Sequence, residues 1–318
     1  EGHLWGGMNT RQWVKLDREN YYVTQCDDLP HQAILSIKCD HQGVLWMATA
    51  SGLLSYHQGK LKRFLPKQYI YSLLEDKQGN LWAGSYKRGL FKFTKQGRVI
   101  NYRQGLLANG VLDLAQGQKG DIWIANNKGF SKITNQNIVF YSQKEGLSGQ
   151  VISSVFEDSQ GYLWLGTYYS GLIGFDGQKF TYYTKRQGLL DDNIKSILES
   201  SLGDIWVATT NGLNCIQKQR ERVNILPYHY QSNGNLLEFR LKSAIASKQG
   251  VLYWGTDRHL VSLDIGTHHP KFSPIDVVIQ QVKVNGKAYD YNQLPDSLQA
   301  TVKYDSISQF YQVPLGLS

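Results

Sequence analysis

The sequence predicts an all-β fold, a seven-bladed β-propeller of four-stranded antiparallel blades with a short C-terminal β segment. Two observations carry this prediction. A pattern built around one tryptophan recurs seven times along the 318 residues, at intervals of 36 to 47 residues. Each interval holds four short apolar runs, separated by Gly, Asp, Ser or Asn turns. Four strands in every repeat of about 40 residues are typical of a β-propeller.

The repeated unit is most complete in "ISSVFEDSQGYLWLGTYYSGL", residues 152–172. Its runs are four to seven residues long and rich in Ile, Val, Tyr and Phe, which is typical of strands. No segment shows sustained helical periodicity. By analogy with other propellers, we expect the "ISSVFED" run to be the innermost strand. The equivalent aromatic residues in the seven copies are Trp5, Trp46, Trp82, Trp123, Trp164, Trp206 and Tyr253.

The tryptophan run has a pattern that suits a sheet covered on both faces. Side chains alternate along a strand, so Leu163, Leu165 and Thr167 point one way and Trp164 and Gly166 the other. All are apolar or small, as packing between neighbouring blades requires. A buried tryptophan removes roughly 200 Å² from water, on the order of 5 kcal/mol before entropy is subtracted. We therefore expect these aromatics to hold neighbouring blades together, with the glycine leaving space beside the indole.

An Asp-x-x-Gly signal joins the first and second strands of a unit. Asp40, Asp76 and Asp158 occupy this column, and Ser200 and Ser247 replace them in weaker copies. An aspartate can accept backbone N–H bonds in a tight turn, and the glycine can adopt positive φ. A row of calcium ligands is the alternative, but equivalent aspartates are spread around a ring and a metal needs converging oxygens. We predict turn chemistry and no metal.

Composition limits the class of protein. Apolar residues make up 41% and charged residues 19%, as in globular proteins, and no apolar run is long enough to span a membrane. The net charge of +8 favours anionic partners but is too dispersed to indicate nucleic acid. Three cysteines make no disulfide framework. The chain opens inside a repeat without a leader, so we expect a fragment whose targeting or membrane segments lie outside it.

A ligand site is expected on the face built by the loops between strands two and three and the loops between blades. These loops are enriched in Tyr, Asn, Lys and Arg, which suit sugar rings, hydroxyls and acidic groups. The alternative is that loops are polar everywhere. The candidate ligand-binding residues are Arg11, Tyr86, Arg88, Asn127, Lys128, Tyr168, Tyr169, Asn211, Arg258 and His259.

Enzyme chemistry has little support in the sequence. It contains no G-x-S-x-G, H-E-x-x-H or phosphate-binding loop, and its eight histidines are scattered. We therefore expect no catalytic residues, no cofactor and no resident metal in this region. Two alternatives stay open: a propeller lyase or hydrolase acting on glycans, and a propeller that binds other proteins through a broad apolar face.

The combined pattern resembles the two-component-regulator propeller repeat family. It stands most fully at residues 152–172 and 70–90, "IYSLLEDKQGNLWAGSYKRGL", and the resemblance covers roughly residues 1–265. It implies the periplasmic sensor region of a bacterial membrane receptor, often a hybrid histidine kinase and sometimes a diguanylate cyclase receptor. It also implies a poly- or oligosaccharide ligand and a homodimeric full receptor. The output domain would lie outside this chain.

The resemblance also divides the chain. It implies a propeller over residues 1–270 and a partial Ig-like or linker segment over residues 271–318, whose start resembles the tyrosine-rich Ig-like domain of the family. Too few residues remain for a complete sandwich. The first unit lacks its upstream strand, so either that strand comes from elsewhere or the ring is incomplete. The alternating segment 277–284 is a further option for closing the ring.

Overall fold

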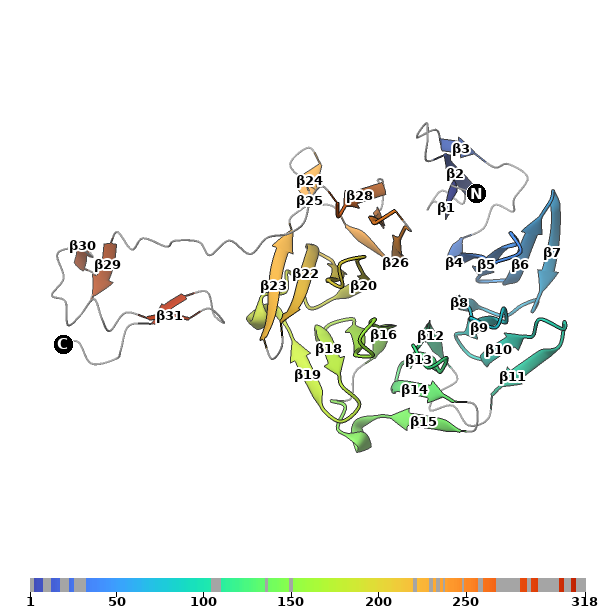
Figure 1. Ribbon diagram of the computed structural model, residues 1–318, viewed down its shortest axis with the longest axis horizontal. Helices are drawn as coiled ribbons and strands as arrows, with labels where there is room; N and C mark the ends of the chain where they lie inside the picture. The colour runs from blue at the N-terminus through green and yellow to red at the C-terminus, as the bar shows by residue number, and fades with distance from the viewer. Residues whose placement is uncertain are drawn as a thin grey trace.

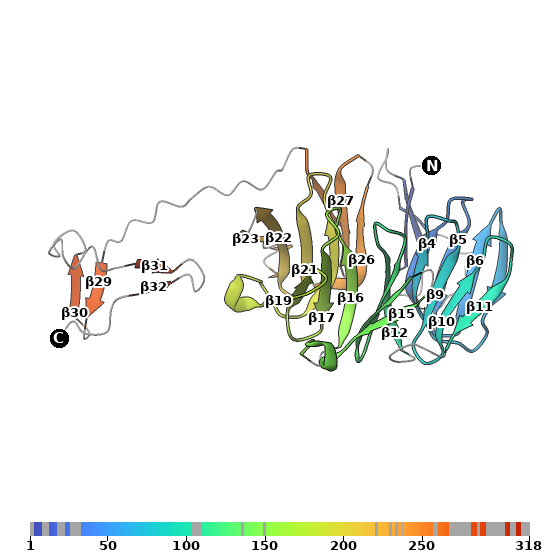
Figure 2. The same cartoon turned by 60° about the horizontal axis from the view of Figure 1, so that its bottom comes forward.

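The protein is a ring of antiparallel sheets around a central channel (Figure 1). Seen from the side, its strands run between the two end faces of the ring (Figure 2). The computed structural model describes residues 3–7, 13–17, 23–25, 33–103, 110–134, 137–148, 151–219, 222–228, 231–232, 235–236, 238–247, 249–256, 260–266, 281–284, 287–290, 303–305 and 310–312.

Five blades have four strands each, in chain order from the channel outward. The first comprises β4 (Ile34–Cys39), β5 (Leu45–Thr49), β6 (Gly52–His57) and β7 (Lys60–Phe64). The second comprises β8 (Ile70–Glu75), β9 (Leu81–Ser85), β10 (Gly89–Phe93) and β11 (Val99–Tyr102). The third comprises β12 (Val111–Gln116), β13 (Ile122–Asn126), β14 (Gly129–Ile133) and β15 (Ile138–Tyr141). The fourth comprises β16 (Ile152–Glu157), β17 (Leu163–Thr167), β18 (Leu172–Phe175) and β19 (Phe180–Tyr183). The fifth comprises β20 (Ile194–Glu199), β21 (Ile205–Thr209), β22 (Gly212–Gln219) and β23 (Arg222–Tyr228).

The sixth blade has three strands, β26 (Phe239–Ala246), β27 (Val251–Thr256) and β28 (Leu260–Asp264). A small hairpin, β24 (Gln231–Ser232) with β25 (Asn235–Leu236), precedes it. The "ISSVFED" run is β16, an innermost strand, as the sequence predicts. Two short 3₁₀ helices, η1 (Gln143–Glu145) and η2 (Lys185–Gln187), connect blades. Within the described part of the chain, no helix has the length and apolarity needed to cross a bilayer.

The predicted propeller of four-stranded antiparallel blades is confirmed, but its seven-bladed count is wrong. The described residues form six blades. The first repeat instead gives a three-stranded sheet of β1 (His3–Gly7), β2 (Trp13–Asp17) and β3 (Val23–Gln25). Among the described residues β1 is the edge of its sheet, where the six blades carry an inner strand.

The C-terminal β segment forms two hairpins. β29 (Gln281–Val284) pairs with β30 (Lys287–Asp290), and β31 (Lys303–Asp305) pairs with β32 (Phe310–Gln312). Closure of the ring by residues 277–284 is therefore wrong for the described part of that segment, because β29 pairs with its own hairpin partner and not with a blade.

The repeated tryptophans from Trp46 to Trp206, whose side chains the structure describes, pack toward the following blade, as expected. Trp164 in the fourth blade is fully buried and lies in one cluster with Ile194, Ile205 and Val207 of the fifth. The small residue two positions later has a different role from the expected one. A Cβ at Gly166 would come within 2.2 Å of Ser154 Oγ and 2.7 Å of Ile194 Cγ2. The glycine therefore makes room for the inner strand and the next blade, and not for the indole.

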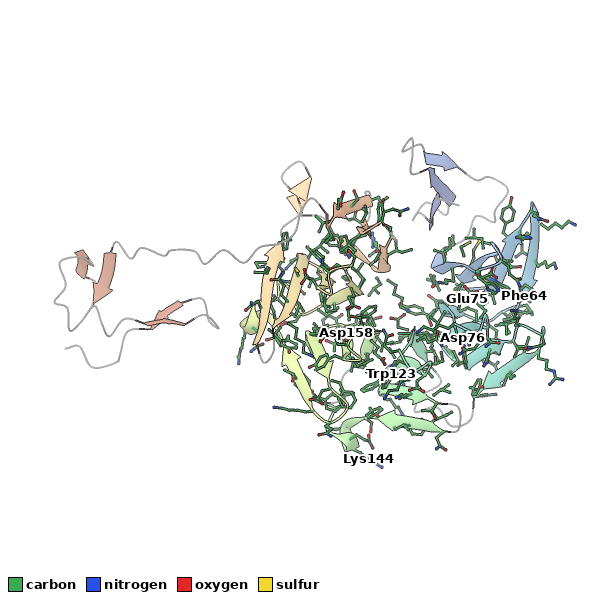
Figure 3. The ribbon with its side chains drawn as sticks, in the orientation of Figure 1. Phe64, Glu75, Asp76, Trp123, Lys144 and Asp158 are labelled. Atoms are coloured by element: carbon green, nitrogen blue, oxygen red, sulfur yellow. The ribbon has the colours of Figure 1, made fainter. Side chains whose placement is uncertain are left out.

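In the second, fourth and fifth blades, the glutamate before the turn joins the blade to the one before it; Glu75 is labelled in Figure 3. Glu75 accepts the backbone N–H of His41 at 3.0 Å, and Glu157 accepts that of Gln118 at 2.7 Å and the indole N–H of Trp123. Glu199 accepts the backbone N–H of Ser159 at 2.8 Å. These three innermost strands are thus tied to the turn of the preceding blade by a charge-assisted hydrogen bond.

Candidate functional site

The two ends of the ring are chemically different. All six innermost strands run in the same direction, because each starts a repeat and is followed by its Asp-x-x-Gly or equivalent turn. We call the end that carries these turns the turn face. The opposite end, with the strand two–three loops and the inter-blade loops, is the loop face. The candidate site lies on the loop face, where the innermost strands begin.

Tyrosines from two loops and one strand gather on this face. The ring centroid of Tyr69 lies 6.2 Å from that of Tyr71 and 5.9 Å from that of Tyr86, and Tyr71 and Tyr86 are 6.4 Å apart. Tyr86 also donates its backbone N–H to the carbonyl oxygen of Tyr69 at 3.0 Å, which ties loop to loop. Tyr69 and Tyr86 are 41% and 48% exposed, so their rings offer aromatic surface to solvent.

A second tyrosine pair joins this cluster from two blades away. Tyr168 and Tyr169 have ring centroids 6.2 Å apart, and Tyr169 is 83% exposed. A side-chain hydrogen bond connects Tyr168 to Tyr71, and it adds to the effect of burial in raising the pKa of the Tyr71 phenol. We call Tyr69, Tyr71, Tyr86, Tyr168 and Tyr169 the tyrosine cluster. It spans the second and fourth blades.

Below the cluster, two charged side chains meet across the channel. Lys242 Nζ of β26 lies 3.5 Å from Asp113 Oδ1 of β12 and 4.4 Å from the centroid of the Tyr71 ring. Asp113 Oδ2 accepts the backbone N–H of Val155 at 3.1 Å. Burial raises the pKa of Asp113 and lowers that of Lys242, and each is opposed by the charge of the other. Strands of the third, fourth and sixth blades therefore meet beneath the tyrosines.

Lys242 reaches this position through an irregular strand. In the fourth blade one residue separates the pairings Ile152↔Thr167 and Ser154↔Gly166. In the sixth, Phe239 pairs with Thr256 and the next pairing is Ala244↔Trp254, so the inner strand carries extra residues. Lys242 lies in this bulge with φ of 58°, a left-handed conformation that is costly for a residue with a Cβ. The local strain directs a long cationic side chain into the channel.

The candidate residues predicted from sequence fall into three groups. Tyr86, Tyr168 and Tyr169 lie in the tyrosine cluster. Arg88, Asn127 and Lys128 are exposed on neighbouring loop tips, and Asn211 of the fifth blade donates from Nδ2 to Asp191 Oδ2 at 3.0 Å. Arg11, Arg258 and His259 lie outside the described residues.

Sequence reasoning missed the residues that connect the site: Tyr69, Tyr71, Asp113 and Lys242. Two of them carried a signal. Asp113 occupies the column that holds serine in the copies with Ser36, Ser72, Ser154 and Ser196. Tyr71 stands where other copies have aliphatic, serine or lysine residues. A departure from the repeat at an innermost strand places an unusual side chain in the channel.

Comparisons with known proteins agree with this architecture. Residues 28–51, 65–87, 146–169 and 188–211 match the two-component regulator propeller family. The extracellular domain assigned to the hybrid two-component system BT3049 of B. thetaiotaomicron is 24% identical, with a TM-score of 0.71 over 92% of this chain and 43% of that one. Virginiamycin B lyase from Staphylococcus aureus is 12% identical, with a TM-score of 0.67 over 82% of this chain and 90% of that one. No curated protein matches the chain.

The sheets and their repeats define the class of protein as a β-propeller. Within that class, the four matched segments carry the two-component regulator propeller repeat. It spans less than half the length of the B. thetaiotaomicron domain that it resembles. The lyase has the same fold, so the fold by itself does not decide between binding and catalysis.

Proposed function

We propose that this chain is an extracytoplasmic, periplasmic ligand-sensing region of a bacterial signalling receptor, and that it binds a poly- or oligosaccharide on the loop face. The observation that carries the proposal is the tyrosine cluster. Tyr69, Tyr86 and Tyr169 expose aromatic rings on the loop face. Contact with water does not favour exposed aromatic surface, so a cluster of it indicates a binding site. Flat aromatic surface flanked by hydrogen-bonding groups suits sugar rings.

The charge around the cluster favours an anionic glycan. Lys67, Lys87, Arg88 and Lys128 are all exposed on loops of this face. A guanidinium can bind a carboxylate or sulfate through two parallel hydrogen bonds. Two acidic side chains of the channel and the loop face are engaged: Asp113 is bonded to Lys242 and Val155, and Asp191 to Asn211 and Lys185.

Binding has to be transmitted to an output domain for this chain to act as a sensor. Within the cluster, Tyr71 contacts Lys242 of β26, and Lys242 pairs with Asp113 of β12. In the proposed receptor, a homodimer, the ligand shifts the relative arrangement of propellers by binding one arrangement more tightly. The proposal assigns to residues 271–318, as the partial Ig-like or linker segment, the role of carrying this change toward the membrane.

Isothermal titration calorimetry with xylohexaose and hexagalacturonate tests the proposal. We expect hexagalacturonate to bind more tightly, and the variants Tyr86→Ala and Tyr169→Ala each to weaken binding at least tenfold. Leu202→Ala is the matched control, because Leu202 is 53% exposed but lies on the turn face. Failure of both sugars to bind would contradict the proposed site. An equal loss of affinity in Leu202→Ala would also contradict it.

A catalytic role on glycans is the alternative, and the same titrations separate the two. A lyase or hydrolase shortens hexagalacturonate during the experiment, which size analysis of the recovered sugar detects. We expect the sugar to be recovered intact. The described part of the loop face brings Asp113 into contact with Lys242 and not with a second carboxylate, which does not resemble an acid–base pair.

A further inference from the structure

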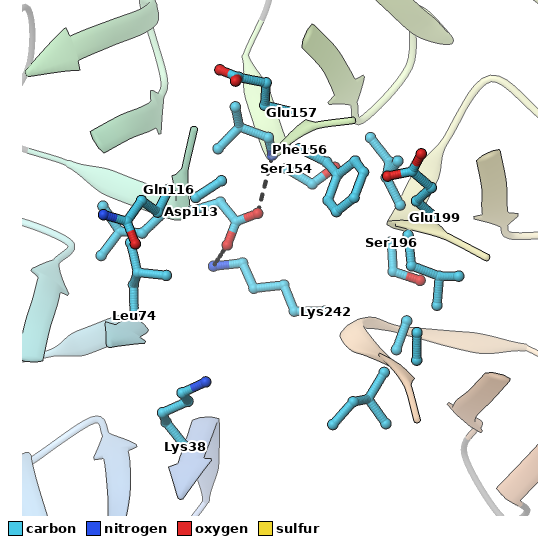
Figure 4. A pocket seen from close by; sticks show the side chains of 18 residues that line it. Lys38, Leu74, Asp113, Gln116, Ser154, Phe156, Glu157, Ser196, Glu199 and Lys242 are labelled. Carbon is cyan, nitrogen blue, oxygen red and sulfur yellow. Dashed lines mark hydrogen bonds and ion pairs between the residues drawn. The ribbon is translucent and has the colours of Figure 1, made fainter. Parts of the chain in front are cut away.

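The net positive charge of the protein lies in its first two blades. Residues 33–103, which form these blades, contain 12 of the 34 lysines and arginines but 3 of the 26 aspartates and glutamates. The rest of the chain therefore holds 22 cationic and 23 acidic residues and is close to neutral. The central channel does not account for the excess charge, because its lining combines lysines with carboxylates: Lys38, Lys242, Asp113, Glu157 and Glu199 (Figure 4).

The three carboxylates of the first two blades do not neutralise these cations. Asp40 and Asp76 each accept the indole N–H of a tryptophan at 2.8 Å, and Glu75 accepts the backbone N–H of His41 at 3.0 Å. Among the described residues, none of the 12 lysines and arginines forms an ion pair. Ten of them are exposed: Lys60, Lys62, Arg63, Lys67, Lys77, Lys87, Arg88, Lys95, Arg98 and Arg103.

Six of the exposed cations lie on the outside of the ring, on or beside β7 and β11, the outermost strands of these neighbouring blades (Figure 1). Lys60, Lys62 and Arg63 belong to β7. Lys95 and Arg98 precede β11, and Arg103 follows it. Together with Val99 and Ile100 of β11, we call these six residues the basic wall.

The basic wall also exposes aliphatic surface. Val99 and Ile100 are 52% and 42% exposed. Neighbouring residues of a strand point to opposite faces of the sheet, so β11 is uncovered on both faces at this point. Lysines on an edge strand are sufficient to discourage pairing with another strand, but that role does not require exposed aliphatic side chains. Cations beside aliphatic side chains suit a bilayer interface, where phosphates and acyl chains lie close together.

We propose that the basic wall docks the propeller on a bilayer that contains anionic phospholipid. The lysines and arginines bind headgroup phosphates, and each guanidinium can form two parallel hydrogen bonds. Val99 and Ile100 enter the boundary between the headgroups and the acyl chains. The strands run between the two end faces of the ring, so contact through its outer wall leaves the loop face open to a ligand (Figure 2). The proposal goes beyond the sugar site and does not depend on it.

Flotation with lipid vesicles tests the docking. Vesicles of phosphatidylcholine with about 30% phosphatidylglycerol should carry the protein, and vesicles of phosphatidylcholine alone should not. Raising NaCl from about 0.05 M to about 0.5 M should lower the bound fraction at least fivefold, because salt screens exposed charges. Tyr86→Ala and Tyr169→Ala should float as the wild type does, which separates this test from the sugar site. Equal flotation with both kinds of vesicle, or with neither, would overturn the proposal.

Charge reversal locates the surface that binds. Lys62→Glu combined with Arg98→Glu should lower the bound fraction at least fivefold, since two attractive charges become repulsive. Lys144→Glu combined with Lys179→Glu is the matched control, because it changes the net charge equally at exposed lysines outside the first two blades. Urea denaturation checks that both variants are folded. Equal losses in the two variants would show that binding follows net charge and would contradict the basic wall.

A fluorescent label tests contact of the aliphatic side chains with lipid. With Cys26→Ser and Cys39→Ser, the remaining thiol is Cys215, which is fully buried. Ile100→Cys and Val139→Cys then place a nitrobenzoxadiazole dye on the outermost strands of the second and third blades, at residues that are 42% and 40% exposed. Anionic vesicles should shift the emission to shorter wavelength at position 100 only. An equal shift at position 139, or no shift at position 100, counts against docking through the basic wall.

Discussion

Asp158 Oδ2 accepts a hydrogen bond from the indole Nε1 of Trp164 at 2.9 Å, while its Oδ1 accepts the backbone N–H groups of Gln160 and Tyr162. One carboxylate therefore closes the turn of a blade and accepts the indole N–H of a fully buried tryptophan. The same bond joins Asp40 to Trp46 and Asp76 to Trp82, each at 2.8 Å. This explains why the aspartate and the tryptophan recur six residues apart in the repeat.

The fifth blade lacks this bond, and restoring it should stabilise the protein. Ser200 caps the turn by accepting the N–H groups of Leu202 and Asp204, but Trp206 Nε1 is buried without a partner. We expect Ser200→Asp to raise the free energy of unfolding by about 1 kcal/mol, because a buried donor gains an acceptor. Urea denaturation followed by tryptophan fluorescence measures this. Ser201→Asp adds the same charge beside the turn, and an equal gain there would show that the indole bond is not the cause.

Removing the link between the third and fourth blades should destabilise the ring. Glu157 accepts hydrogen bonds from Gln118 N and Trp123 Nε1, so Glu157→Ala leaves both donors without their acceptor. We expect a loss of roughly 2–3 kcal/mol in the same denaturation experiment. Glu157→Gln retains one acceptor oxygen, and Gln116 already occupies this column and accepts Lys77 N at 2.7 Å. Its loss should be smaller, and equal losses would contradict this account.

The stability of Lys242→Met should depend on pH. Burial already raises the pKa of Asp113, and the charge of Lys242 opposes that shift, so its removal raises the pKa further. The folded state then holds the Asp113 proton more tightly than the unfolded state does. Stability of the variant therefore falls as pH rises from the unfolded value through the folded pKa. At neutral pH we expect a deficit of roughly 3–5 kcal/mol.

Denaturation of wild type and Lys242→Met at pH 4 and pH 7 measures this dependence. The deficit should be smaller at pH 4, where Asp113 takes up a proton in the variant. Lys242→Met with Asp113→Asn removes the unpaired charge and should recover much of the stability at pH 7. A deficit that is the same at both pH values would contradict the ion pair as its cause.

The two described thiols should differ in reactivity. Cys215 is fully buried in β22, and burial raises the pKa of its thiol. Cys39 is exposed at the end of β4. With iodoacetamide under native conditions, we expect alkylation of Cys39 and protection of Cys215 until the protein is unfolded, as read by peptide mass spectrometry. Native alkylation of Cys215 would show that the fifth and sixth blades open readily.

The repeat in the sequence was sufficient to predict the blades. Trp164, Asp158, Gly161 and Leu172 recur at fixed spacing, and they serve in turn for packing between blades, turn capping, positive φ and the core. Each of these roles involves residues of one repeat, or residues at equivalent positions in neighbouring repeats. The exposed tyrosines Tyr86 and Tyr169 were predictable for a related reason, because they occupy loops whose place in a blade follows from the repeat.

Only the tertiary structure decided how the blades join and what the channel contains. The sequence has seven copies of the repeated motif, whereas the described residues form six blades and a three-stranded sheet from the first copy. Tyr71, Asp113 and Lys242 belong to three blades and meet because the ring brings their strands to one axis. Lys242 depends further on a bulge whose register no local pattern specifies. A periodic sequence determines the unit, whereas closure of the ring and burial of charge depend on contacts between units far apart in the chain.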